Sequence, residues 1–208
     1  MKQPGEIRAP QAQTDDAGAT RGAAQHSGSP WRSLQWWPTL VAIAFAGFVA
    51  IDLSSGVEFA PILAASGLVY LGAAALQKPS TAWPLFFATV VVITAASIGV
   101  AHFDPTWVFL GLAGLFVAYG LLRGAARPTD GLPLQTIAMI AFGAAAAIAL
   151  VVNEVVGAYL VAAGLLGHAA WDVYHHRTNK VVARSLAEFC FVLDTVLAVL
   201  IVVVTVRG

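Results

Sequence analysis

Residues 185–206 read SLAEFCFVLDTVLAVLIVVVTV, an apolar stretch of 22 residues whose only charged positions are Glu188 and Asp194. A transmembrane helix needs roughly 20 mostly apolar residues to cross about 30 Å of hydrocarbon. This stretch meets that requirement, so it predicts a membrane-spanning helix. The same length criterion decides the reading of the rest of the chain.

Six more apolar stretches precede it, and the sequence therefore predicts an all-α integral membrane bundle of seven transmembrane helices. Hydrophobic residues make up 59% of the chain and charged residues 11%, whereas soluble domains carry roughly 25% charged residues. The six earlier spans are expected at about 36–52, 57–76, 82–101, 106–122, 132–152 and 154–174.

The basic residues fall almost entirely in alternate gaps between the spans. Ten of the 11 Lys and Arg residues lie in the N-terminal part or in the second, fourth and sixth gaps, and only Arg207 lies on the other side. This positive-inside pattern predicts a multi-pass protein of the plasma (cell inner) membrane with a cytoplasmic N-terminus. The net charge of zero excludes nucleic acid as a partner. The lipid bilayer is the expected partner, and a homo-oligomer or a second membrane protein remains open.

Residues 1–35 have a different composition, rich in Gln, Ala, Gly, Pro and Thr and without periodic apolar positions. Such a segment buries too little surface to offset its ordering entropy, so we expect a disordered cytoplasmic tail. It lacks the short apolar core of a signal peptide. The transmembrane domain is expected to occupy residues 36–208.

Three segments with a central glycine suggest an internal repeat. They read AASGLVYLGAAAL around Gly67, GLAGLFVAYGLLRG around Gly114 and VAAGLLGHAAWDV around Gly164, with offsets of 47 and 50 residues. The first six spans then form three copies of one helical hairpin, followed by a seventh helix.

This pattern resembles the HdeD-like acid-resistance membrane proteins, which are short, have six spans and consist of similar glycine-punctuated hairpins. The resemblance covers roughly residues 40–174, and it implies a stress-related membrane role without assigning functional residues. The seventh span and the segment HAAWDVYHHR (168–177) depart from the pattern. The residues that carry the resemblance are Gly47, Gly67, Gly72, Gly114, Gly120 and Gly164.

Five acidic or histidine residues lie in the turns predicted outside: Asp52, Glu58, His102, Asp104 and Glu154. No Lys or Arg lies among them, so they could form a cation-attracting vestibule. Each also lies where a helix begins, and capping with favourable helix-dipole interactions explains them more simply.

The end of the sixth span carries the most informative polar residues. His168, Asp172, His175 and His176 have the spacing i, i+4, i+7 and i+8, which places them within about 100° of one helix face. Imidazole and carboxylate groups on one face could ligate a transition metal. The simpler interpretation places the later histidines at the membrane interface and pairs Asp172 with Arg177, Lys180 or Arg184. We expect no required metal and no cofactor.

Asp194 lies near the middle of the seventh span, where an unpaired carboxylate costs a few kcal/mol. His168 lies at a comparable depth in the preceding antiparallel helix, so we expect the two side chains to meet. The pair either binds a functional ligand or proton, or locks the two helices together. Asp172, Glu188 and Asp194 are the candidate catalytic acids if the protein is an enzyme.

Several function classes are excluded by missing residues. The seventh span has no lysine for a retinal Schiff base, no glycine-rich nucleotide loop follows a strand, and five histidines are too few for a histidine-rich di-iron hydroxylase. Three classes remain. The sequence favours a non-catalytic stress-related or accessory component, because structural roles explain most of its polar residues. The alternatives are a proton-coupled small-solute carrier or channel using His168 and Asp194, and an intramembrane enzyme acting on a lipid or isoprenoid.

Overall fold

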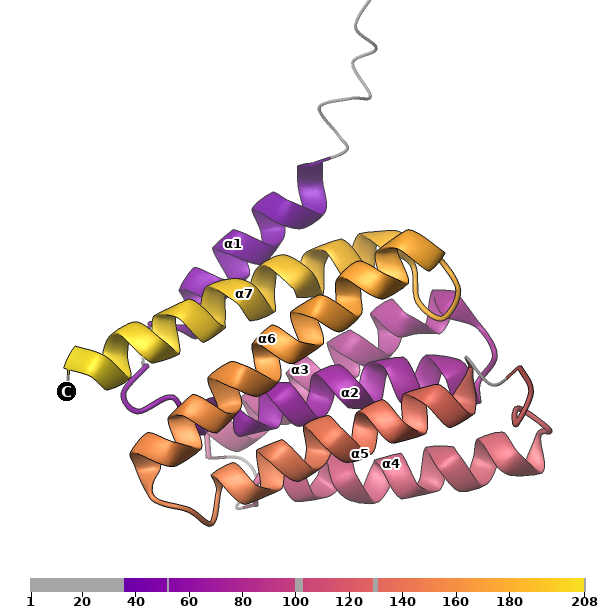
Figure 1. Cartoon of the computed structure of the whole chain (residues 1–208), viewed down its shortest axis with the longest axis horizontal. Helices are drawn as coiled ribbons and strands as arrows, with labels where there is room; N and C mark the ends of the chain where they lie inside the picture. Colours follow the sequence, from indigo (N-terminus) through magenta and orange to yellow (C-terminus); the bar gives the residue numbers. More distant parts are fainter. Residues whose placement is uncertain (1–35, 52, 100–102, 129–130, 208) are drawn as a thin grey trace, which may run out of the picture.

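The computed structural model describes residues 36–51, 53–99, 103–128 and 131–207, and all regular structure within these ranges is helical. The predicted tail at 1–35 lies outside them. The helices (Figure 1) are α1 (Trp37–Val49), η2 (Val57–Phe59), α2 (Ala60–Ala75), η3 (Pro79–Thr81), α3 (Ala82–Ser97), α4 (Pro105–Leu122), α5 (Leu132–Ala149), α6 (Glu154–Thr178) and α7 (Arg184–Arg207). The all-α prediction is confirmed.

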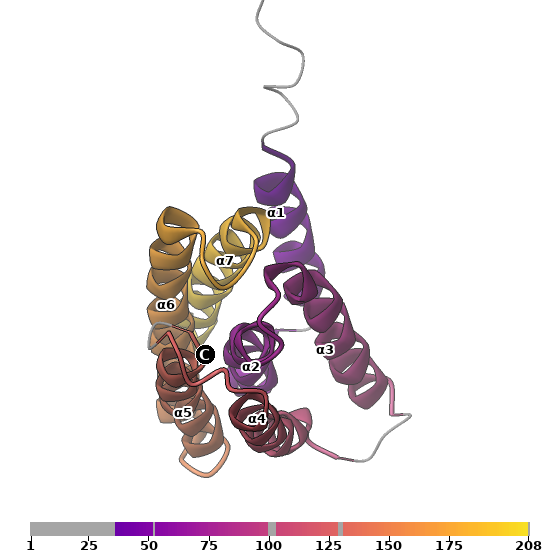
Figure 2. The ribbon, with the colours of Figure 1, turned by 90° about the vertical axis from the view of Figure 1, so that its right-hand side faces the viewer.

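Helix α2 forms the centre of the bundle. Figure 2 shows it inside the ring of the other long helices, and it packs against α3, α4, α5 and α6, while α1 packs against α7. Every residue of α2 except Ile62 is buried. Because α2 consists mainly of Ala, Gly and Leu, neighbouring backbones can approach it closely on all sides.

Within the described part of the chain, six helices are long and apolar enough to cross a membrane. Their outward faces carry large apolar side chains such as Phe87, Ile140 and Leu122, the last being 88% exposed. Such a surface suits lipid rather than water. These features fit an integral membrane protein.

Helix α1 is shorter than the predicted 36–52 span. It has 13 residues and measures ~20 Å at 1.5 Å per residue, compared with about 30 Å of hydrocarbon. The two tryptophans at its start, Trp36 and Trp37, are both exposed. By length alone α1 does not reach across a bilayer.

Capping accounts for the acidic residues that the structure describes in the turns. The Asp104 carboxylate accepts a hydrogen bond from the Thr106 backbone N–H at 2.8 Å. The Asn153 side chain, next to Glu154, likewise caps α6. The Glu58 carboxylate accepts hydrogen bonds from the backbone N–H groups of two preceding serines. The capping interpretation holds for these positions. Asp52 and His102 lie outside the described residues.

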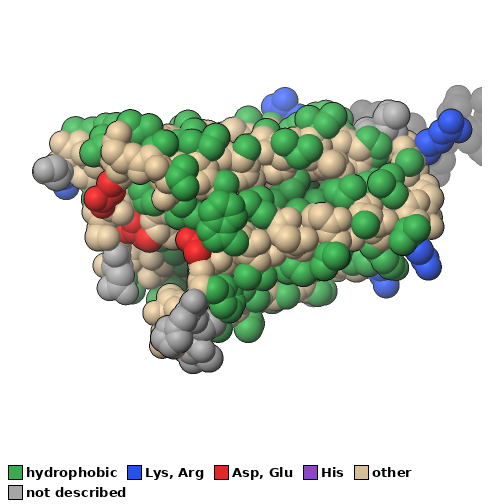
Figure 3. All heavy atoms as spheres, turned by 90° about the horizontal axis from the view of Figure 1, so that it is seen from below, with side chains coloured by type: hydrophobic (Ala, Val, Ile, Leu, Met, Phe, Trp, Pro, Cys, Tyr) green, Lys and Arg blue, Asp and Glu red, His purple; other side chains and the backbone are tan. Residues whose placement is uncertain are grey.

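The two ends of the bundle carry opposite charge. Figure 3 shows Asp and Glu side chains at one end and most Lys and Arg side chains at the other. The turns after α2, α4 and α6 lie together at the basic end, as Figure 1 shows. Alternate connections of an antiparallel bundle therefore produce the charge separation expected from the sequence.

The three aligned glycines have different surroundings. A Cβ on Gly164 would lie 2.4 Å from Leu63 and one on Gly67 would lie 3.0 Å from Met139, whereas one on Gly114 meets nothing within 4 Å. Gly67 and Gly164 thus lie where another helix packs closely, whereas Gly114 faces open space. The three-hairpin repeat stays a prediction.

Candidate functional site

His168 and Asp194 meet between α6 and α7. The Nδ1 atom of His168 lies 2.8 Å from the Asp194 Oδ2 atom, and both side chains are fully buried. These antiparallel helices pack closely along their length, which brings residues of equal depth together. The contact predicted from the sequence is confirmed, while its functional role stays a prediction.

Asp172 lies one helical turn after His168 and contacts the same imidazole. We call His168, Asp172 and Asp194 the cluster. The Asp172 Oδ2 atom lies 3.3 Å from the His168 Nδ1 atom, and its Oδ1 atom accepts a 2.5 Å hydrogen bond from the Tyr70 hydroxyl of α2. The predicted pairing of Asp172 with Arg177, Lys180 or Arg184 is therefore wrong. The reason is its helical angle, which points the carboxylate inward at α2 rather than toward the interface.

His175 also lies inside the bundle, not at the interface as expected. Its Nε2 atom is 2.9 Å from the Gln135 amide nitrogen, and its Nδ1 atom is 3.0 Å from the Trp171 carbonyl oxygen. The Gln135 amide oxygen in turn accepts from the Trp171 indole N–H at 3.1 Å. This arrangement requires the Gln135 NH₂ group to donate to Nε2 and Nδ1–H to donate to the carbonyl, so the imidazole is neutral.

His176 and Glu188 lie apart from the cluster. His176 is exposed because, relative to His168, the helix turns it by about 80°, compared with about 40° for Asp172 and −20° for His175. The Glu188 carboxylate accepts a 2.7 Å hydrogen bond from the Thr39 hydroxyl of α1. Of the residues expected to share one face, His176 is the one that does not.

The cluster keeps unused hydrogen-bonding capacity. His168 Nε2, Asp172 Oδ2 and Asp194 Oδ1 are buried without a hydrogen-bond partner among the described residues. One imidazolium and two carboxylates would carry a net charge of −1. Because an uncompensated buried charge is costly, this arrangement has room for one more positive charge.

A metal ion is one way to supply positive charge. His168, Asp172 and Asp194 each offer one ligand atom, and these atoms lie within 4.8 Å of one another. Three ligands fall short of the four that close a structural zinc site. Two ligand atoms bonded to one metal ion at about 2 Å lie about 2.8–3.3 Å apart, so the 2.8 Å contact between nitrogen and oxygen is compatible with a shared proton and with a metal ion alike, and the absence of a required metal stays a prediction.

The sequence analysis missed two residues that contact the buried polar side chains of α6: Tyr70, which contacts Asp172, and Gln135, which contacts His175. Tyr70 is the one aromatic hydroxyl in a helix otherwise made of small and aliphatic residues, and Gln135 is the one amide in α5. An isolated polar side chain within a predicted span was the signal that would have found both.

A surface hollow of about 330 Å³ lies on the α6–α7 face. It is lined by Asp172 and Glu188 together with His176, Arg177 and three apolar residues. Asp172 belongs to its wall, but its carboxylate points inward to Tyr70 and is fully buried.

Comparisons of this chain with known protein families, with curated proteins and with solved structures found no match.

Proposed function

We propose that this protein is a multi-pass plasma membrane protein in which His168, Asp172, Asp194 and Tyr70 form the proton-binding centre of a proton-coupled small-solute carrier. One observation carries the proposal. A single imidazole nitrogen lies between two fully buried carboxylates, 2.8 Å from one and 3.3 Å from the other.

The charge of this group is the first argument. With an imidazolium and two carboxylates the cluster is one proton short of neutrality, and in the apolar core of the bundle the neutral state is favoured. Uptake of that proton by a carboxylate, and its release, changes the charge of the centre by one unit. A site with two such states is what coupling to a proton gradient requires.

The second argument is a line of polar groups from the cluster toward the basic end. The Tyr70 ring packs edge-on against both His168 and His175, with ring centroids 5.1 and 4.9 Å apart. His175 then contacts Gln135 in the first turn of α5. These groups extend from the cluster toward that end of the protein, and the Tyr70–His175 step is a ring contact without a hydrogen bond, so proton passage along them requires water.

The proposal includes seven spans and a cytoplasmic basic end. The positive-inside pattern favours this orientation. The apolar side chains of α1 that face away from the bundle, such as Leu40 and Phe48, favour its insertion into the same bilayer, where local thinning and flanking tryptophans accommodate a short helix.

Infrared difference spectroscopy tests the proton centre directly. In reconstituted protein, a pH titration should reveal the carbonyl stretch of a protonated carboxylic acid, and Asp194→Asn or Asp172→Asn should alter or remove it. Glu154→Gln, which removes an exposed carboxylate at the other end, is the matched control. An unchanged spectrum in both Asp variants would show that no proton is exchanged at this site.

Charge movement tests the carrier function. Proteoliposomes on a solid-supported membrane should give proton currents that depend on an added solute and vanish in Asp194→Asn. If proton exchange is seen without any solute-dependent current, the cluster instead serves a non-catalytic component, in line with the stress-related role that the HdeD-like resemblance implies.

A second candidate function is an intramembrane enzyme acting on a lipid. The observation that favours it is the hollow on the α6–α7 face, whose wall includes Glu188 and lies next to the buried carboxylate of Asp172. Incubation with bacterial lipid extract and mass spectrometry of the products would identify such an activity. Glu188→Gln separates the two candidates, because it should abolish lipid turnover while leaving the infrared signature of Asp194 unchanged.

A further inference from the structure

Two adjoining hollows lie between α1 and α3. The outer hollow has a volume of about 310 Å³ and lies at the surface of the bundle, since Val41 and Phe87 of its wall are exposed. The inner hollow has a volume of about 110 Å³ and extends inward to α2 and α7. Both hollows are lined by Phe45, Phe86 and Val90, which places the inner hollow next to one that faces the bilayer.

The wall of the inner hollow contains a buried hydroxyl without a partner, that of Ser66. Ile62, Ala65, Ser66 and Val69 line the hollow with the spacing i, i+3, i+4 and i+7, so one face of α2 is directed toward it. Ser66 is only 9% exposed, and its hydroxyl makes no hydrogen bond within the part of the chain that the structure describes. Because an unpaired hydroxyl in an apolar interior is unfavourable, a molecule in the hollow would be stabilised by bonding to it.

The other two hydroxyls of this wall have different surroundings. The Thr89 hydroxyl donates a 2.8 Å hydrogen bond to the Phe86 carbonyl oxygen, and Thr94 is exposed. Ser66 is therefore the position at which a bound molecule gains a buried hydrogen bond.

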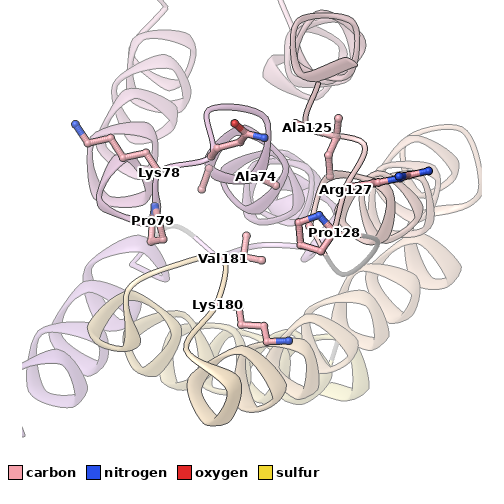
Figure 4. Close-up of a pocket in the computed structure, with 12 residues that line it drawn as sticks. Ala74, Lys78, Pro79, Ala125, Arg127, Pro128, Lys180 and Val181 are labelled. Atoms are coloured by element: carbon pink, nitrogen blue, oxygen red, sulfur yellow. The ribbon is translucent and has the colours of Figure 1, made fainter. Parts of the chain in front are cut away.

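The charge of the lining limits what can bind. Neither hollow has a charged residue in its lining within the described ranges, whereas the hollow at the basic end, shown in Figure 4, has Lys78 and Arg127 in its lining. A charged molecule between α1 and α3 would lose its hydration without gaining a counter-charge. The occupant is therefore uncharged.

The shape and composition of the walls suit a ring. Phe45 and Phe86 meet edge to face with ring centroids 6.1 Å apart, and aromatic rings favour such contacts with one another. A cavity of about 150 Å³ lined by Leu, Ile and Phe binds benzene, so an inner hollow of about 110 Å³ that adjoins a second one has room for a single ring. A lipid acyl chain would fill the space but offer no partner to Ser66.

We propose that the inner hollow binds an uncharged compound of one aromatic ring with one hydrogen-bonding oxygen, which pairs with the Ser66 hydroxyl, and that this class of compound is the solute of the carrier. The second part rests on the proposed function. Ser66 lies one helical turn before Tyr70 in α2, and Cys190 of the wall lies one turn before Asp194 in α7. Because both helices also carry the proton centre, a change in their packing on solute binding can act on its proton equilibrium.

Binding is tested with two probes of equal size, 4-fluorophenol and 4-fluorotoluene, which differ by a hydroxyl in place of a methyl group. The full chain in phosphatidylcholine nanodiscs is titrated at pH 7 and followed by fluorine NMR, and empty nanodiscs correct for partition of each probe into lipid. The wild type should bind 4-fluorophenol about two- to tenfold more tightly than 4-fluorotoluene, the contribution of one hydrogen bond. Ser66→Ala should remove this difference and leave the affinity for 4-fluorotoluene unchanged.

A pair of variants in α3 tests the position of the site. Val90→Phe places a ring where the two hollows adjoin and should abolish binding of both probes. Val91→Phe, the matched control, adds the same ring at an exposed neighbouring position outside both linings and should bind as the wild type does. Equal affinity for the two probes in the wild type, or unchanged binding in Val90→Phe, would overturn the proposal.

Proton currents test the assignment of the solute. In the solid-supported membrane assay, 4-fluorophenol should give a current in the wild type and in Val91→Phe but none in Val90→Phe or in protein-free liposomes. If the probe binds but only other solutes give currents, the solute assignment is overturned and the binding site stands. If it binds and no solute gives a current, the carrier function fails as well. If it does not bind while another solute gives a current, this inference fails and the carrier function stands.

Discussion

Removing the imidazole of His168 should destabilise the protein more than removing the charge of Asp194. His168→Leu leaves two carboxylates buried with no cation between them, whereas Asp194→Asn keeps an amide oxygen within reach of Nδ1 and takes the cluster from a net charge of −1 to neutrality. The structure thus predicts that His168→Leu loses more stability than Asp194→Asn, an order that a count of lost hydrogen bonds alone does not give.

The magnitudes follow from the contacts. Breaking a buried ion pair from one side costs about 3–5 kcal/mol, and protonating a carboxylate at pH 7 to relieve the repulsion costs about 4 kcal/mol. A hydrogen bond between helices in a membrane contributes only about 0.6–1.7 kcal/mol. His168→Leu should therefore lower the free energy of unfolding by about 2–4 kcal/mol more than Asp194→Asn.

The assay is SDS-induced unfolding in mixed micelles, followed by tryptophan fluorescence at pH 7 and pH 5. Folded His168→Leu must bind one proton to bring its two carboxylates from a charge of −2 to −1, so its free energy of unfolding should rise by about 1.4 kcal/mol for each pH unit lowered. A triple variant that also carries Asp172→Asn and Asp194→Asn should recover most of the stability. If His168→Leu is as stable as Asp194→Asn at pH 7, the charge argument is refuted.

Three other predictions concern packing, capping and topology. Gly157→Ala should destabilise by about 1–3 kcal/mol in the same unfolding assay, because its Cβ would lie 2.6 Å from the Ala149 carbonyl oxygen, whereas Gly114→Ala, with nothing within 4 Å, should be neutral or slightly stabilising. Asp104→Ala removes the cap of α4 and should cost about 1 kcal/mol, detectable as a lower thermal midpoint. A cysteine at Ser80 in a cysteine-free background should react with an impermeant maleimide only after cells are permeabilised, and labelling in intact cells would contradict the cytoplasmic placement of the basic end.

The sequence was sufficient to predict the helices because apolar length is a local property. Each predicted span corresponds to a helix, and the largest differences at one end are four residues: α3 ends at Ser97 rather than near residue 101, and α6 continues to Thr178 rather than ending near residue 174. The sequence did not reveal that α2 is the central helix. Its apolar residues resemble those of the other spans, and whether a helix faces lipid or protein depends on neighbours that are distant in the chain.

The cluster was predictable in part. Spacing within one helix can be read from the sequence, whereas contacts with helices that are distant in the chain cannot. Helix spacing places His168 and Asp172 on one face, and matching depth brings Asp194 to them. The contribution of Tyr70 depends on α2 lying against that face. For the same reason, His175 was wrongly expected at the interface and Asp172 was wrongly expected to pair with a basic residue near the helix end. The inward direction of both side chains depends on their contacts with α2 and α5.

The composition of α2 and the position of the cluster have a common physical basis. Because Gly164 of α6 has no Cβ, the Leu63 side chain of α2 packs directly against it, and the two helices approach each other at this point. Tyr70 lies about two helical turns after Leu63 in α2, and its hydroxyl donates a hydrogen bond directly to Asp172. A bulkier α2 would hold α6 farther away and leave the carboxylate without its donor. The contact of α2 with α6 therefore supplies one of the two buried carboxylates with a hydrogen-bond donor inside the bundle.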